Sequence, residues 1–176
     1  MKIVTITSSP HRKGTTDVLA SAFCRGAEEA GHEVFRFDAA RERVQPCLAC
    51  DACRRTGACV QKDGMESLMP RLLEADGIAF VTPLYYYGMS AQLKAVIDRF
   101  YARNSDLAGK KRTVLLAASY DAEDWTMAAL ERHYETILRY LGWEDAGRVL
   151  AVGCGDRAAI EQTDFPEQAY RLGKSL

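Results

Sequence analysis

The sequence predicts an α/β fold in which a parallel sheet carries helices on both faces. Two observations support this prediction. Short apolar runs rich in β-branched residues alternate with segments of helical periodicity along the whole chain. Residues 78–82 form a continuous apolar run, as expected for a strand that is buried on both faces. Such alternation is typical of parallel strands joined by helical crossovers.

The first half of the chain contains two expected strands with a helix between them. Residues 2–7 are a short β-branched run, and residues 32–38 alternate apolar and polar side chains. In residues 15–30 the apolar side chains recur at helical spacing, and a glycine follows them. Residues 39–64 show no clear periodicity. Within them, the segment at about 44–64 carries four cysteines and is called the cysteine loop below.

The second half continues the alternation. The expected helices are residues 65–75, 90–103, 123–141 and 166–173, and the expected strands are residues 78–82, 111–119 and 148–153. The long helix at 123–141 starts with two acidic residues, which the helix dipole favours at that end. No repeat or linker divides the chain, so we expect a single domain over residues 1–176.

The composition narrows the class of protein. The chain is 48% hydrophobic and 27% charged with a net charge of −1, the balance of a soluble globular protein. This charge does not suit a nucleic-acid binder, and no apolar run is long enough to span a membrane. No signal-peptide pattern is present. We therefore expect a cytoplasmic protein with no nucleic-acid or membrane partner.

The loop after the first strand has the chemistry of an anion site. Hydroxyls, loop amides and a helix N-terminus converge where the strand order of such a sheet reverses. The chain lacks both the G-x-x-x-x-G-K-[ST] and the G-x-G-x-x-G motif, so a mononucleotide phosphate such as that of FMN fits better than ATP or a dinucleotide. The alternative is a helix cap and a turn. The candidate residues are Ser9, His11, Arg12, Gly14, Thr15 and Thr16.

Two further loops follow neighbouring strands and can hold a planar ring. Tyrosines offer flat surfaces and hydroxyls, and a glycine lets backbone approach a ring closely. The alternative is an aromatic-rich subunit interface, and we expect both roles in part. The candidate ring-binding residues are Pro83, Leu84, Tyr85, Tyr86, Tyr87, Gly88 and Met89, with Ser119 and Tyr120 on a third side.

These segments resemble the NAD(P)H-dependent FMN reductase family. The resemblance lies in Ser9-Pro10-x-x-x-Gly14-x-Thr16, Thr82-Pro83-Leu84-Tyr85-x-x-Gly88-Met89-Ser90-Ala91-Gln92-Leu93-Lys94 and Ile97-Asp98-Arg99. The resemblance implies a flavodoxin-like three-layer sandwich, with a five-stranded parallel sheet in the order 2-1-3-4-5. It also implies bound FMN, NAD(P)H as co-substrate and a homodimer or homotetramer. His11 and Thr15 stand where the family commonly has Arg and Asn.

Four cysteines lie close together at Cys47, Cys50, Cys53 and Cys59. Within the family this set resembles the iron–sulfur flavoproteins, in which four thiolates hold a [4Fe-4S] cluster beside FMN. Two alternatives stay open. The cysteines can be thiols without a cluster, or they can form a zinc site, although this spacing suits zinc less well. Cys24 and Cys154 stand apart and are expected to be small buried side chains.

The sequence as a whole predicts an FMN-dependent oxidoreductase that passes electrons from NAD(P)H through FMN to an acceptor it does not identify. A second interpretation is an electron carrier for a ferredoxin-like partner, without a nicotinamide site. A third is a non-enzymatic redox or zinc-binding module. We expect no catalytic side chain, because a flavin carries the chemistry itself.

Overall fold

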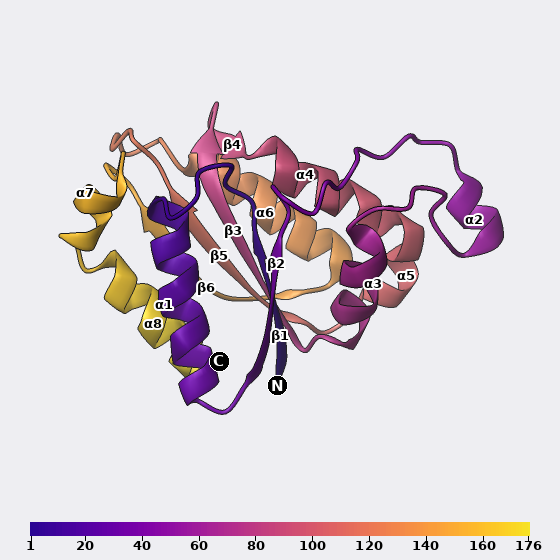
Figure 1. Cartoon of the computed structure of the whole chain (residues 1–176), viewed down its shortest axis with the longest axis horizontal. Helices are drawn as coiled ribbons and strands as arrows, with labels where there is room; N and C mark the ends of the chain where they lie inside the picture. Colours follow the sequence, from indigo (N-terminus) through magenta and orange to yellow (C-terminus); the bar gives the residue numbers. More distant parts are fainter.

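The computed structural model describes all 176 residues, and a twisted sheet forms its centre (Figure 1). Its parallel strands are β1 (Lys2–Thr7), β2 (Glu33–Asp38), β3 (Gly77–Tyr85), β5 (Arg112–Ala118) and β6 (Glu144–Ala151). They lie in the order β2-β1-β3-β5-β6, which confirms the predicted 2-1-3-4-5 arrangement. The two-residue β4 (Gly88–Met89) is a sixth strand that was not predicted, and it pairs antiparallel with the end of β3.

Helices cover both faces of the sheet (Figure 1). One face carries α1 (Thr15–Glu29), α7 (Arg157–Glu161) and α8 (Phe165–Ser175). The other carries α3 (Met65–Glu74), α4 (Ala91–Asp98), the 3₁₀ helix η1 (Arg99–Arg103), α5 (Asn104–Leu107) and α6 (Ala128–Leu141). The short α2 (Ala52–Thr56) lies at the far end of the cysteine loop, away from the sheet.

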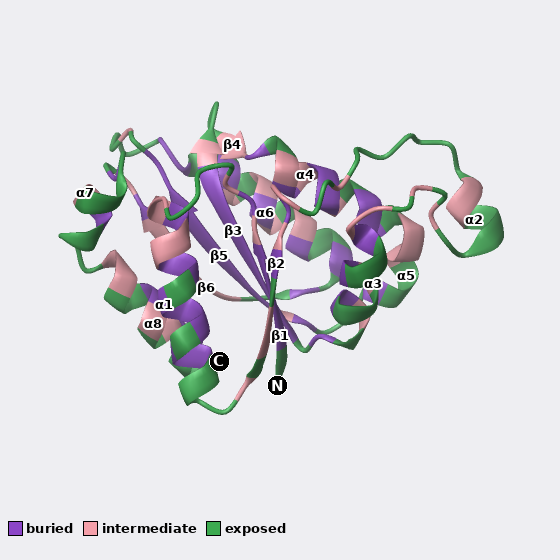
Figure 2. Ribbon diagram, viewed as in Figure 1, coloured by how far each residue is buried: buried purple, intermediate pink, exposed green.

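The two cores follow from the alternation of side chains along the strands. On β3, Ile78 and Phe80 face the α3–α6 side, whereas Ala79 and Val81 face the α1–α8 side. All four are at most 2% exposed, and the central strands are the most continuously buried part of the chain (Figure 2). The buried run in the sequence therefore identified the middle of the sheet correctly.

Helices α1 and α8 pack backbone against backbone through two glycines. A Cβ atom on Gly26 would lie 2.1 Å from the carbonyl oxygen of Tyr170, and one on Gly173 would lie 2.1 Å from that of Phe23. Neither position has room for a side chain. This contact holds the C-terminal helix α8 against α1 on this face of the sheet.

The helix expected over residues 90–103 is α4 followed by η1, and β3 extends beyond residues 78–82 at both ends. The two largest shifts of a boundary are at the starts of α6 and β6. Helix α6 begins at Ala128 rather than 123, because successive turns occupy residues 124–127 and Thr126 Oγ1 donates to Asp121 Oδ2 at 2.8 Å. Strand β6 begins at Glu144 rather than 148, because Arg112 pairs with Glu144 on the adjacent strand. Its first residues are polar because they lie on an edge strand.

Cys24 and Cys154 are 9% and 3% exposed, which confirms that they are buried thiols. No helix combines the length and the apolar character that crossing a membrane requires.

Candidate functional site

The structure brings the three predicted loops together at the carboxyl edge of the sheet. Thr7 is paired in register with Val81. Ser8 Oγ donates to the Val81 carbonyl at 2.9 Å, and Ser90 Oγ donates to the Ser8 carbonyl at 3.3 Å. On the other side, Pro83 is paired with Ala118. Buried hydrogen bonds and strand pairing thus fix the loops after β1, β3 and β5 relative to one another.

The first turn of α1 has unused backbone donors. The residue before the helix is Gly14, and no side chain caps the helix. The amides of Thr15 and Thr16 donate to no carbonyl, whereas those of Asp17 and Val18 donate to the Gly14 carbonyl. No hydroxyl of this loop therefore caps the helix, whereas the turn part of that alternative holds for Ser9, whose Oγ accepts from the His11 amide at 3.2 Å. Two free N–H groups at a helix N-terminus are suited to binding an anion.

A polar cavity of about 350 Å³ lies beside this turn. Its lining residues are Thr7, Ser9, His11, Arg12, Thr16, Asp17, Arg36, Asp38 and Arg41. Arg36 is paired with Asp17 at 2.5 Å, and Arg41 is paired with Asp38. The wall thus combines hydroxyls with three guanidinium groups. Arg36 and Arg41 were not among the predicted site residues, because only the pairing of β2 with β1 brings them to this edge.

The tyrosine segment forms a tight hairpin between β3 and β4. Tyr85 pairs with Gly88, so Tyr86 and Tyr87 are its two loop residues. Both have positive φ, 46° and 62°, the conformation of a type I′ turn that Asn and Gly normally occupy. A bulky residue in this region is strained by about 1–3 kcal/mol. Strained residues of this kind cluster at functional sites. In this turn the side chain of Tyr86 is fully exposed to solvent.

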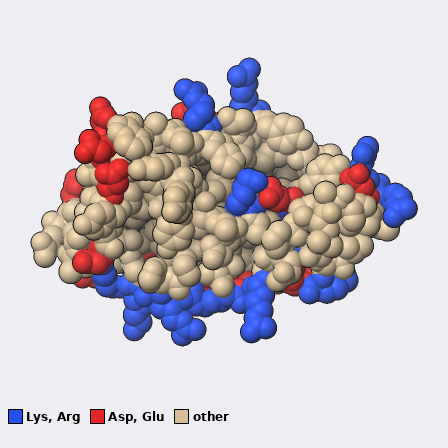
Figure 3. Space-filling view, turned by 90° about the horizontal axis from the view of Figure 1, so that it is seen from above, with Lys and Arg blue, Asp and Glu red and all other residues tan.

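A loop from β5 meets this hairpin. The ring of Trp125 packs on that of Tyr87 with centroids 4.9 Å apart. Ser119 is buried and donates to the Asp121 carbonyl at 2.7 Å, so its hydroxyl is used within its own loop. Tyr120 is 88% exposed. Seen from above, the carboxyl edge is largely uncharged, with one group of basic and acidic side chains near its middle and the other charges toward its margins (Figure 3).

The cysteine loop leaves the body through a narrow neck. Arg99 donates to Asp63 at 2.8 Å and also to the carbonyls of Gln45 at 3.0 Å and Gln61 at 3.4 Å. Asp63 in turn accepts from the Gln45 amide at 3.0 Å, and Gln61 Nε2 donates to the Pro46 carbonyl at 2.9 Å. The neck, residues 45–46 and 61–63, therefore closes the loop on a buried ion pair.

The four cysteines of the loop line one small cavity of about 20 Å³. The loop turns sharply there, since Ala49 and Asp51 have φ of 51° and 56°, and the Ala49 amide donates to Cys47 Sγ at 3.4 Å. No three of the thiols are close enough together to hold a metal ion in this structure. Four soft donors around one cavity nevertheless fit a four-thiolate group in identity and placement, provided that the loop contracts around it.

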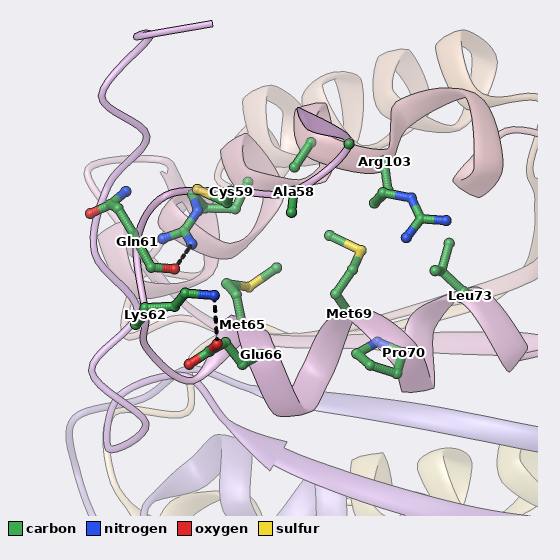
Figure 4. A pocket seen from close by; sticks show the side chains of 13 residues that line it. Ala58, Cys59, Gln61, Lys62, Met65, Glu66, Met69, Pro70, Leu73 and Arg103 are labelled. Carbon is green, nitrogen blue, oxygen red and sulfur yellow. Dashed lines mark hydrogen bonds and ion pairs between the residues drawn. The ribbon is translucent and has the colours of Figure 1, made fainter. Parts of the chain in front are cut away.

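A larger cavity of about 380 Å³ lies between the cysteine loop and α3 (Figure 4). Met65, Met69, Pro70 and Leu73 form its apolar side, and Cys59 lies across from them on the loop. This cavity is remote from the carboxyl edge. The cavity separates this part of the cysteine loop from α3.

The fold and the arrangement of its loops define a flavodoxin-like α/β protein. The family described as NADPH-dependent FMN reductase matches residues 1–156, and the chain belongs to this family.

Individual relatives are consistent with this assignment. An iron–sulfur flavoprotein of Archaeoglobus fulgidus is 40% identical over 119 residues, which cover 68% of this chain and 54% of that protein. A putative NAD(P)H-dependent FMN-containing oxidoreductase of Bacillus subtilis is 28% identical over 87% of this chain and 86% of its own length. The chain spans about half the length of the iron–sulfur flavoproteins that it matches.

A solved structure shows the same fold over nearly the whole chain. It is the NAD(P)H:quinone oxidoreductase of Methanothermobacter marburgensis, with a TM-score of 0.75 and 20% identity. The match covers 99% of this chain and 96% of that one.

Proposed function

We propose that this protein is an FMN-dependent oxidoreductase that takes electrons from NAD(P)H and passes them to a separate acceptor. The observation that carries the proposal is the uncapped first turn of α1, where the free amides of Thr15 and Thr16 lie beside a polar cavity. Membership of the FMN reductase family supports the phosphate of FMN as the ligand of that anion site. FMN, when bound, supplies hydride acceptance and one-electron transfer.

The residues of the first loop hold the phosphate in this proposal. The amides of Thr15 and Thr16 donate to its oxygens, and Thr16, only 3% exposed, adds its hydroxyl from the cavity wall. Ser9, Gly14 and the basic side chains of His11 and Arg12 complete the site. Arg12 or the paired Arg36 can supply the positive charge that an arginine at position 11 would have provided.

The hairpin and the β5 loop hold the ring. Pro83 is buried at the sheet edge, and Leu84, Gly88 and Met89 follow it on the two hairpin strands. The aromatic side chains of Tyr85, Tyr86, Tyr87 and Tyr120 supply flat surfaces around it. Ser119 contributes by shaping the loop backbone, because its hydroxyl already donates to Asp121.

We further propose that Cys47, Cys50, Cys53 and Cys59 hold a [4Fe-4S] cluster. Their shared cavity and the several relatives named iron–sulfur flavoproteins support this proposal. A second candidate function follows from it, in which the chain is an electron carrier that serves a ferredoxin-like partner. The projection of the loop away from the sheet favours access by such a partner (Figure 1). We also propose that the chain assembles as a homodimer or homotetramer.

Substitution of Thr16 tests the phosphate site. Thr16→Val keeps the shape but removes the hydroxyl, and we expect FMN to bind about 10- to 100-fold more weakly, since a hydrogen bond to a charged group contributes about 1.5–3 kcal/mol. Thr16→Ser should restore binding. Thr136→Val, on the exposed surface of α6, is the matched control. Unchanged FMN affinity in Thr16→Val, measured by flavin fluorescence, would place the phosphate elsewhere.

Absorption and rapid mixing separate the two candidate functions. Protein purified without oxygen should show flavin bands and a broad shoulder that dithionite bleaches if the cluster is present. Bleaching of the flavin by NADH or NADPH in a stopped-flow instrument supports the reductase. Bleaching by dithionite or reduced ferredoxin alone supports the electron carrier. A colourless protein that takes up no added FMN contradicts both.

A further inference from the structure

The ion pair at the neck is among the most buried charged groups of the molecule. The side chains of Arg99 and Asp63 are 2% and 7% exposed. Arg99 reaches the loop on both sides of its cysteines, since Gln45 lies two residues before Cys47 and Gln61 lies two residues after Cys59. One guanidinium group therefore fixes both points at which the cysteine-bearing segment begins and ends.

One polar atom of this guanidinium has no partner. Arg99 Nε is the single buried side-chain nitrogen or oxygen in the structure without a hydrogen bond. Leaving such a donor unpaired costs about 1–3 kcal/mol, so an acceptor is expected when the protein is functional. Arg99 lines the same cavity as Cys59. Cys59, labelled in Figure 4, also lines the small cavity with the other three cysteines. Cys59 thus connects Arg99 to the set of four thiols.

We propose that Arg99 is the positioning residue of the four-thiolate site: it fixes the neck of the loop, and its Nε–H donates to the sulfur of Cys59 when the thiolates hold the cluster. This inference rests on the cluster proposed above. A fixed neck lowers the entropy that is lost when four thiolates gather around one group. An N–H···S bond stabilises the more negative, reduced state and therefore raises the reduction potential.

Cobalt binding tests the positioning role. Co²⁺ bound by four thiolates gives visible ligand-field bands at longer wavelengths than flavin absorption, so the FMN-loaded protein with a metal-free, reduced loop can be titrated directly. Arg99→Lys keeps the charge beside Asp63 but cannot bridge both carbonyls. We expect it to weaken Co²⁺ binding about tenfold or more, as is typical when a residue that supports metal ligands is changed. Arg103→Lys is the matched control, because Arg103 lines the same cavity and pairs with Asp106 at the surface.

The reduction potential tests the Nε–H···S bond itself. In the iron-loaded protein, a titration monitored by electron paramagnetic resonance should give a more negative cluster potential in Arg99→Lys than in the wild type. Arg103→Lys should leave the potential unchanged. A residue that merely holds the fold together would alter stability and cluster content without moving the potential of the clusters that form.

The outcomes distinguish this proposal from the one on which it rests. FMN content and thermal unfolding report whether each variant folds. If Arg99→Lys does not fold, Gln61→Ala tests the neck, because it removes the Nε2 bond to Pro46 alone and should still weaken Co²⁺ binding. If the wild type shows the tetrathiolate bands of Co²⁺, but Arg99→Lys leaves the Co²⁺ affinity and the cluster reduction potential unchanged, only the role of Arg99 is overturned. A wild-type chain without tetrathiolate bands overturns the cluster and this role together.

Discussion

Tyr87 and Trp125 pack ring against ring, with centroids 4.9 Å apart and planes inclined by 36°. Tyr87 belongs to the hairpin after β3, and Trp125 belongs to the loop after β5. The contact therefore joins two of the three loops at the carboxyl edge. Both rings remain about half exposed, at 42% and 53%, so the pair is a bridge between loops rather than part of the core.

The first prediction concerns this bridge. Tyr87→Ala and Trp125→Ala should show a coupling energy of about 0.5–1.5 kcal/mol in a double-mutant cycle of unfolding free energies, as aromatic pairs do. Each single variant should also weaken FMN binding, because the hairpin loses its lateral support. Tyr87→Ala combined with Tyr140→Ala, on the distant surface of α6, is the control. Purely additive effects of the first pair would contradict the bridge.

The second prediction concerns the strained turn. Replacing Tyr86 by Asn should raise the unfolding free energy by about 1–3 kcal/mol, because Asn adopts positive φ readily and the contact between Tyr87 and Trp125 is kept. The same change should weaken FMN binding, since one aromatic surface is lost. Denaturant unfolding of the apoprotein and flavin titration measure the two effects separately. A less stable apoprotein would show that the turn is not strained.

The third prediction concerns the crossing of α1 and α8. Alanine normally stabilises a helix relative to glycine by about 0.8–1 kcal/mol, yet Gly26→Ala should destabilise this protein by about 1–3 kcal/mol. The reason is that the added Cβ would lie 2.1 Å from the Tyr170 carbonyl oxygen. Glu28→Ala, on the exposed face of the same helix, should change stability by less than about 0.5 kcal/mol. Urea unfolding of both variants measures whether Gly26→Ala lowers or raises the unfolding free energy.

The fourth prediction concerns acid stability. Burial acts to raise the pKa of Asp63, but hydrogen bonds from Arg99 and from the amides of Gln45 and Met65 outweigh it, so the pKa is lowered. The Asp63 carboxylate therefore binds a proton less tightly in the folded chain than in the unfolded chain. The resulting stability is present above the unfolded pKa of about 3.9 and is lost as the pH falls through the folded value.

Asp63→Asn should therefore be less stable near neutral pH, by about 3–5 kcal/mol for one partner removed from a buried pair. Its unfolding free energy should also decline less steeply on acidification than that of the wild type. Asp98→Asn, which removes an exposed partner of Lys94, is the control. If the unfolding free energies of the wild type and Asp63→Asn declined equally steeply on acidification, Asp63 would not titrate as described.

Local pattern predicted most of the sheet, because strands buried on both faces leave long apolar runs such as residues 78–82. It also predicted which loops meet, since parallel strands end at a common edge. It missed β4 because Tyr86-Tyr87 lacks the Asn-Gly signature of a hairpin.

Contacts between residues that are far apart in the chain could not be predicted from the sequence either. The Arg99–Asp63 pair joins residues 36 positions apart, and Arg36 reaches the polar cavity only through the pairing of β2 with β1. No local periodicity encodes either contact. The site residues of the first loop, by contrast, could be proposed from a single short segment.

The closed neck gives the cysteine loop independence from the rest of the fold. Residues 45 and 61 are both held by Arg99, so the chain between them begins and ends at one place on the body. Its length and its thiols can change in evolution without displacing a strand, and a designer could transplant it by matching only its two ends. A relative can therefore lose these cysteines and keep the flavin site, or keep the cysteines and lose the flavin site.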